Sequence, residues 1–257
     1  MESQSDRTLP RSVLVAEDSF YREILHSSDL VAMLDNRDAM VIPASGRAEV
    51  YEKESAAIRA VLVSAGQLIP NALLVRNPYE AASYEFAADA VEAFSNAKYH
   101  ALANVARLLG AREIKFVDAQ ADQSSSSWAA DVMAKIPIGG GGSKATNDVT
   151  KKLEKKLEGS MTFPGGEPAP ADALAYLRRR NLSNDQQLQD LVEMRTGTNL
   201  ISHYRMRLSG TRESAANLES ALNIANVGPA KAISIGGNFT KTADALSSIE
   251  ITTEITF

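Results

Sequence analysis

Residues 77–116 read NPYEAASYEFAADAVEAFSNAKYHALANVARLLGAREIKF, and the spacing of their apolar side chains changes at Gly110. After Gly110, Ile114 and Phe116 alternate with charged neighbours, which is the spacing of a half-buried strand. Before it, apolar side chains recur every three or four residues, as on one helix face; they are Phe86, Ala90, Phe94, Ala97, Ala101, Val105 and Leu108. The chain is therefore expected to change from helix-rich to strand-rich structure at this glycine.

The start of this helix is predicted from its capping residues. Asn77 suits the N-cap, Pro78 the first helical position and Glu80 the place of the acid in a capping box. With Gly110 as its end, the sequence predicts one helix of about 30 residues, longer than the usual 10–14. Its alanine-rich face favours close approach of another element.

The rest of residues 1–110 is also expected to be mainly helical. Helices are predicted over 19–34 and 53–65, the second ending at Gly66. Between them the sequence predicts only brief extended pieces, at residues 13–15, 40–42 and 73–75.

Strands are expected to dominate residues 111–257. Alternating apolar residues predict hairpins within 112–138 and 231–257, and the Ser-rich run 122–127 forms the first turn. Residues 149–158 fit either a narrow helix face or a strand, and we favour a helix followed by a strand from Ser160. The other predicted elements are a helix near 171–180, one near 184–195 capped by Ser183, a strand within 200–208 and a helix capped by Thr211.

These elements predict an α+β fold. A helical N-terminal half with one long helix is expected to pack on a largely antiparallel sheet of about five to six strands. We expect a single integrated domain over residues 1–257, with a helical part (1–110), a strand-rich part (111–257) and a flexible Gly-rich segment (139–147). The alternative is that Gly139–Gly142 separates two domains.

Composition excludes several classes of protein. The 257 residues are 44% hydrophobic and 23% charged, and the net charge of −5 disfavours a dedicated nucleic-acid binder. The absence of cysteine excludes disulfides, thiol nucleophiles and cysteine-ligated metals. Because the sequence has no run of about 18 apolar residues and begins without a secretory signal pattern, we expect a cytoplasmic protein.

Common catalytic signatures are also absent. The three histidines, His26, His100 and His203, lie in no metal-binding spacing, and there is no nucleophile elbow, phosphate-binding loop or dinucleotide fingerprint. Residues 139–144 offer glycine amides and a lysine, which suit a phosphate, but without the required spacing. We therefore predict no cofactor and no metal, and favour a protein that is not an enzyme.

Basic residues are the main candidates for binding an anion or a partner. They form a first cluster on 151–156 and a second on 178–180. The ordinary interpretation of the first cluster is a solvated face, and that of the second is a group of cations at a helix C-terminus. If these clusters lie together with the basic residues of 205–207, they form one positive face for lipid headgroups, a nucleotide or an acidic partner. The candidates are Lys151, Lys152, Lys155, Lys156, Arg178, Arg179, Arg180, Arg205 and Arg207.

The only tryptophan, Trp128, is a core residue at a sheet end or an anchor for a membrane or partner.

Three functions follow from the sequence. The favoured one is a non-enzymatic binding or self-assembling module that acts through protein–protein contacts, using a helix face or a strand edge to dock itself or another protein. The alternatives are a membrane-active pore-forming effector with amphipathic β-hairpins on an anionic membrane, and an enzyme with a site assembled around His203, Arg205 and Arg207.

Overall fold

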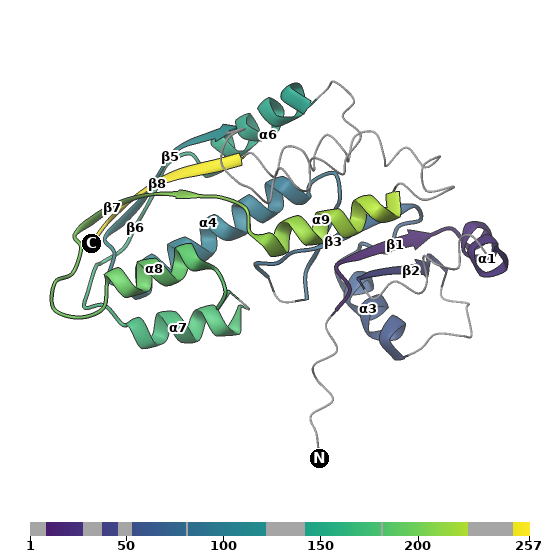
Figure 1. The fold of residues 1–257 in the computed structure, drawn as a ribbon, viewed down its shortest axis with the longest axis horizontal. Coiled ribbons are helices and arrows are strands. Elements are labelled where there is room, and N and C mark those ends of the chain that lie inside the picture. The colour runs from purple at the N-terminus through teal and green to yellow at the C-terminus, as the bar shows by residue number, and fades with distance from the viewer. Residues whose placement is uncertain are drawn as a thin grey trace, which may run out of the picture. The chain divides into compact units, whose positions relative to one another are not determined.

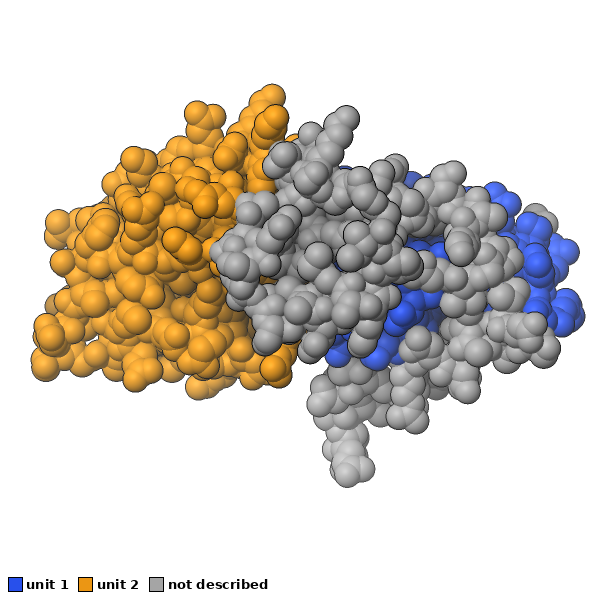
Figure 2. Space-filling model, turned by 45° about the horizontal axis from the view of Figure 1, so that its top comes forward, with its two compact units in different colours: residues 1–77, 82–90, 216–240 blue, residues 78–81, 91–215, 241–257 orange. Residues whose placement is uncertain are grey.

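The computed structural model describes residues 9–27, 38–45, 53–80, 82–121, 142–180, 182–225 and 249–257. Seven helices and eight strands lie in this part of the chain (Figure 1). The chain divides into two compact units: unit 1 comprises residues 1–77, 82–90 and 216–240, and unit 2 comprises residues 78–81, 91–215 and 241–257 (Figure 2). The fold is mixed α+β, and the expectation of a single integrated domain stays a prediction.

Unit 1 is built on sheet A, a four-stranded sheet with the order β2-β1-β3-β4. Strand β1 runs parallel to β2, whereas β1 with β3 and β3 with β4 are antiparallel. The helix α1 (Asp18–His26) follows β1 in the chain. The strands are β1 (Ser12–Ala16), β2 (Ala39–Pro43), β3 (Ala72–Arg76) and β4 (Tyr84–Phe86).

Both faces of sheet A are covered by helices. On one face, Ile58 and Leu62 of α3 (Lys53–Ser64) pack against Val13 and Val15 of β1. Ser12 precedes Val13, so its side chain points to the other face, where it lies 2.7 Å from the hydroxyl of Ser220. Ser220 belongs to α9 (Arg212–Ala225), so residues 216–225 of α9 cover this second face.

Unit 2 is built on sheet B, a four-stranded antiparallel sheet with the order β6-β5-β8-β7. One face packs on α4 (Ala90–Leu108), where the rings of Tyr99 and Phe116 meet edge to face. Three more helices complete the unit: α6 (Gly142–Leu157), α7 (Pro170–Arg179) and α8 (Gln186–Met194). The strands are β5 (Glu113–Ala121), β6 (Ser160–Thr162), β7 (His203–Leu208) and β8 (Ile249–Thr256).

The prediction of a helical N-terminal half is wrong. The extended pieces at 13–15, 40–42 and 73–75 do form strands, but they are three of the four strands of sheet A rather than brief connections. Instead of one sheet with five to six strands, the described residues form two sheets with four strands each. Because β1 is buried at every position, it lacks the alternation by which a half-buried strand is recognised.

The prediction of a single helix of about 30 residues is also wrong, because α4 spans only Ala90–Leu108. Asn77 does not cap it. The backbone N–H of Asn77 instead donates to the carbonyl of Ser83, 2.8 Å away, which closes a loop before β4. Tyr84 is 2% exposed and its hydroxyl donates to the carbonyl of Pro10. Burial of this ring in a strand therefore outweighs the helix propensity of its neighbours.

Several other predictions are confirmed. The helices α3 and α4 end just before Gly66 and Gly110, both of which have positive φ angles. The ambiguous segment 149–158 is helical as far as Leu157, and β6 begins at Ser160. Helix α8 is present, although its N-cap is Asp185 rather than Ser183. The proposed strand of 128–138, Gly139–Gly141 and the strand within 231–241 lie outside the described residues.

Candidate functional site

The face of sheet B that points away from α4 is polar and organised in rows across the strands. A register shift between Phe116 and Asp118 keeps the side chains of β5 in step with those of β8 and β7. One row joins Lys115, Glu254 and Arg205, and the next joins Asp118, Thr252 and Arg207. This outward face therefore carries cross-strand pairs of opposite charge.

The two arginines of this face form only long ion pairs. Arg205 Nε lies 3.8 Å from Glu254 Oε1, and Arg207 Nη1 lies 3.6 Å from Glu250 Oε2. The two arginine side chains remain 60% and 70% exposed. They line a surface hollow of about 380 Å³ together with Asp118, Gln120 and Thr252. Both guanidinium groups therefore retain donors for a further acceptor.

Strand β7 is the last strand of sheet B within the described residues. The backbone N–H of Phe257 donates to the carbonyl of Ser202, the residue opposite it in the register with β8. Bonded and non-bonded pairs alternate along an antiparallel ladder, so Tyr204 bonds to β8 whereas the backbone groups of His203, Arg205 and Arg207 point away from β8. These three residues form the outer edge of β7.

The C-terminal end of this edge, at Arg207, is held by a side chain of α8. Gln187 Nε2 donates to the carbonyl of Arg207 at 2.6 Å, and its Oε1 lies 3.4 Å from the backbone N–H of Ser209. Gln187 already donates to the Arg207 carbonyl. Among the described residues, the part of the edge that pairs with no other strand is therefore His203 and Arg205, together with the N–H of Arg207.

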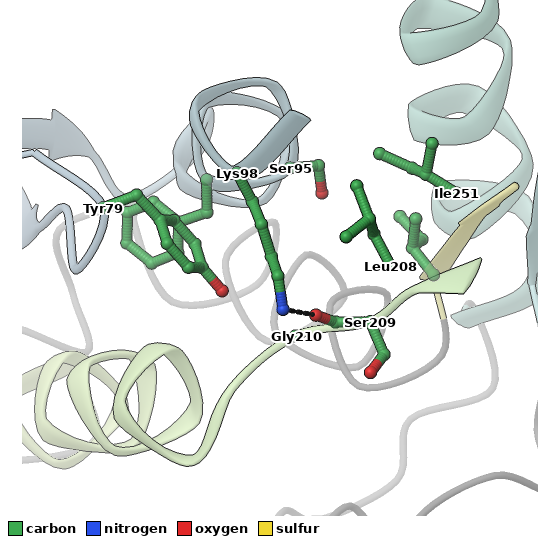
Figure 3. Close-up of a pocket in the computed structure, with 9 residues that line it drawn as sticks. Tyr79, Ser95, Lys98, Leu208, Ser209, Gly210 and Ile251 are labelled. Atoms are coloured by element: carbon green, nitrogen blue, oxygen red, sulfur yellow. Dashed lines mark hydrogen bonds between the residues drawn. The ribbon is translucent and has the colours of Figure 1, made fainter. Parts of the chain in front are cut away.

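The buried side chain of a lysine on α4 contacts this end of sheet B. Lys98 of α4 is 3% exposed, and its Nζ lies 2.9 Å from Asp185 Oδ2. The same Nζ donates to Gln187 Oε1 at 2.8 Å and to the carbonyl of Ser209 at 2.9 Å. Figure 3 shows its side chain passing the ring of Tyr79 on the way to Ser209. Lys98 therefore joins α4, the start of α8 and the end of β7.

The environment of Lys98 is that of a structural group. Burial lowers its pKa, and the carboxylate of Asp185 acts in the opposite direction. Burial also raises the pKa of Tyr79 to about 12, and the Tyr79 hydroxyl lies 3.3 Å from Thr211 Oγ1. The cavity lined by Lys98 and Tyr79 has a volume of about 10 Å³, which is room for about one water molecule. This cavity is too small for a substrate.

The basic residues predicted from the sequence lie on three separate elements. The four lysines of 151–156 are exposed on α6, and Lys156 pairs with Glu92 at 3.2 Å. Arg178 and Arg179 are exposed at the end of α7, and Arg180 lies over the ring of Tyr176. Figure 1 shows α6 and α7 well apart within unit 2. Only Arg205 and Arg207 are brought together, with His203 on the same side of β7. Trp128 lies outside the described residues.

Lys98, Asp185 and Gln187 were not among the residues predicted from the sequence. Lys98 had a detectable signal, because it follows Phe94 by four residues and precedes Leu102 by four, on the apolar face of α4. A lysine on such a face needs a buried partner. Its partner is on a distant segment, which sequence spacing does not reveal.

Comparison with protein-family models, curated proteins and solved structures gave no match to this chain. Within the described ranges, no group of three or more His, Asp or Glu side chains is placed to hold a metal ion. None of the described helices has the length and apolar character needed to cross a bilayer.

Proposed function

We propose that this protein is a non-enzymatic binding module that holds an extended segment of a partner protein against the outer edge of β7. The observation that carries the proposal is the orientation of the backbone of His203 and Arg205 away from β8. An unpaired strand edge offers alternating donors and acceptors, which an added strand satisfies by main-chain hydrogen bonds.

The other edge strand of sheet B suits this role less well. Strand β6 spans only Ser160–Thr162, so an added strand would gain few hydrogen bonds there. Strand β7 has six residues, and hydrogen bonds from Gln187 and Lys98 hold its C-terminal end in the absence of a partner. A fixed edge lowers the ordering cost of binding.

The proposal is tested with short peptides selected from a displayed random library, using the full chain as the target. Amide hydrogen exchange is then measured with and without a selected peptide. We expect the amides of His203, Arg205 and Arg207 to gain protection, because they would donate to the added strand. Protection confined to other elements, or failure to select any peptide, would contradict strand addition at β7.

A matched pair of variants isolates the backbone contribution. His203→Pro removes an outward N–H at the first residue of an edge strand, where proline is tolerated. His203→Ala removes the same side chain and keeps the N–H. We expect the proline variant to bind about three- to tenfold more weakly than the alanine variant, the effect of one hydrogen bond. Equal affinities, with unchanged circular dichroism, would count against the proposal.

A further inference from the structure

We infer that the segment bound at β7 is acidic, with carboxylate side chains at alternate positions opposite Arg205 and Arg207. The inference rests on the proposed function and specifies its partner. Its basis is the juxtaposition of an outer strand edge that no described strand pairs with and two exposed arginines, each at the end of a row of polar and charged side chains.

The two rows of sheet B place charged side chains on neighbouring strands. Across the first row the signs are positive, negative and positive, at Lys115, Glu254 and Arg205. The second row runs from Asp118 through Thr252 to Arg207. In both rows the residue on β7 is an arginine. Because opposite charges on neighbouring strands stabilise a sheet and like charges destabilise it, the next strand should present anions at these two positions.

The geometry of an added strand allows this pairing. Side chains directly opposite on neighbouring strands have Cβ atoms about 4.5–5.5 Å apart, within reach of an arginine and a carboxylate. The acids of β8, Glu250 and Glu254, would be two strand spacings away, about 10 Å, where salt screens much of their repulsion. Successive residues alternate between faces, so the two carboxylates must be two residues apart.

The arginines are free to make these contacts. Their pairs with Glu254 and Glu250 are 3.8 and 3.6 Å long, and each guanidinium has five N–H donors. The distance and exposure of each pair indicate a weak interaction that leaves donors for a second carboxylate.

A second copy of this chain does not fit the site. Two β7 strands paired edge to edge would bring Arg205 and Arg207 of one copy close to the same arginines of the other. The sequence contains one pair of acidic residues two positions apart, Glu52 and Glu54, and Glu54 belongs to helix α3. The segment is therefore expected to come from another protein.

The test uses three short capped peptides of equal length, in which valine alternates with glutamate, glutamine or lysine. Binding to the full chain is measured by isothermal titration calorimetry at low and at physiological salt. We expect the glutamate peptide to bind about tenfold more tightly than the glutamine peptide at low salt, and this ratio to shrink as salt is added. The lysine peptide should bind most weakly.

Charge-reversal variants locate the effect. Arg205→Glu with Arg207→Glu should reverse the preference, so that the lysine peptide binds more tightly than the glutamate peptide. The matched control, Arg178→Glu with Arg179→Glu, makes the same change of charge on exposed residues of α7 and should leave the preference unchanged. Arg205→Gln with Arg207→Gln, which adds no negative charge, should abolish the preference and keep the fold, as checked by circular dichroism.

The outcomes separate the two proposals. Equal binding of the glutamate and glutamine peptides, with protection of the β7 amides, would overturn the acidic preference and support strand addition. An equal effect of the α7 and β7 charge reversals would also overturn the inference, because the attraction would then come from overall charge. Binding of none of the peptides would overturn the inference, and absence of β7 protection by library peptides would overturn the proposed function as well.

Discussion

Sheet A and sheet B have four strands each, but they use their two faces differently. Strand β1 of sheet A is buried at all five positions, because α3 covers one face and α9 the other. In sheet B, β7 alternates between buried Met206 and Leu208 and exposed Arg205 and Arg207. Among the described residues, sheet A is therefore buried between helices, whereas sheet B has one solvent-exposed face and ends at the edge strand β7.

The cores beneath the two sheets also differ in polarity. The cluster between sheet A and α3 consists of apolar and aromatic residues, with Ile58 and Leu62 of the helix against the strands. The core beneath sheet B includes the ion pair of Lys98 and Asp185. A buried ion pair adds little net stability, but removing one of its two partners lowers the free energy of unfolding strongly. The two sheets should therefore respond differently to substitution.

The largest expected effect is at the buried ion pair. Lys98→Met leaves the carboxylate of Asp185 buried without its cation and should lower the free energy of unfolding by about 3–5 kcal/mol. Adding Asp185→Asn removes that charge and keeps an N-cap side chain for α8, so the double variant should recover part of the loss. Urea unfolding followed by circular dichroism measures both, and a single variant as stable as the parent chain would show that the pair is dispensable.

Neighbouring residues test the difference between the two sheets directly. Both side chains are buried, so Leu14→Ala in β1 should lower the free energy of unfolding by about 2–5 kcal/mol and Val15→Ala by about 1.5–3 kcal/mol. In β5, Ile114→Ala should cost a similar amount, whereas Lys115→Ala should cost less than about 1 kcal/mol because its side chain is exposed. If one of the two β1 variants were neutral in urea unfolding, sheet A would not be covered on both faces.

The same difference explains what the sequence could predict. Alternation identified β7 and β8, because one side of sheet B is solvated. Sheet A has no such alternation, so β1, β2 and β3 were recognised only as isolated extended pieces and β4 was predicted to be part of a helix. The helix ends at Gly66 and Gly110 were predictable because left-handed backbone favours glycine.

The candidate site was predictable only in part. Arg205 and Arg207 were predicted from local sequence as two of nine candidate binding residues. The open edge of β7 depends on which strand pairs with which, and pairing between distant segments is not encoded in local spacing. The support from Lys98 and Gln187 likewise depends on contacts between α4 and α8, far apart in the chain.

The two helix-ending glycines differ in their surroundings and should differ in tolerance. A Cβ at Gly110 would lie 2.2 Å from the carbonyl oxygen of Gly166, whereas a Cβ at Gly66 would contact nothing within 4 Å. Both have positive φ angles, which cost about 1–2 kcal/mol for alanine. Gly110→Ala should therefore lower the free energy of unfolding by about 3 kcal/mol or more, and Gly66→Ala by about 1 kcal/mol. Equal losses in urea unfolding would contradict this packing difference.

Tyr79 predicts a dependence on alkaline pH. Burial raises its pKa from 10.0 to about 12, so the folded chain keeps the phenol proton after the unfolded chain has lost it. The resulting stabilisation is fully present below pH 10 and is lost as the pH rises to about 12. The loss is at most about 3 kcal/mol. Tyr79→Phe has no ionisable group and should show a shallower fall in unfolding free energy over this range; parallel curves would contradict the assignment.

The smallest expected effect is on the outward face of sheet B. Arg205→Gln and Arg207→Gln should each change the free energy of unfolding by less than about 1 kcal/mol, because their ion pairs are long and exposed. Thermal unfolding at low and high salt measures this, and the difference from the parent chain should vanish at high salt. A loss above 2 kcal/mol in either variant would mean that the arginines hold sheet B together. Small losses combined with loss of acidic-peptide binding would show that these arginines contribute to recognition and little to folding.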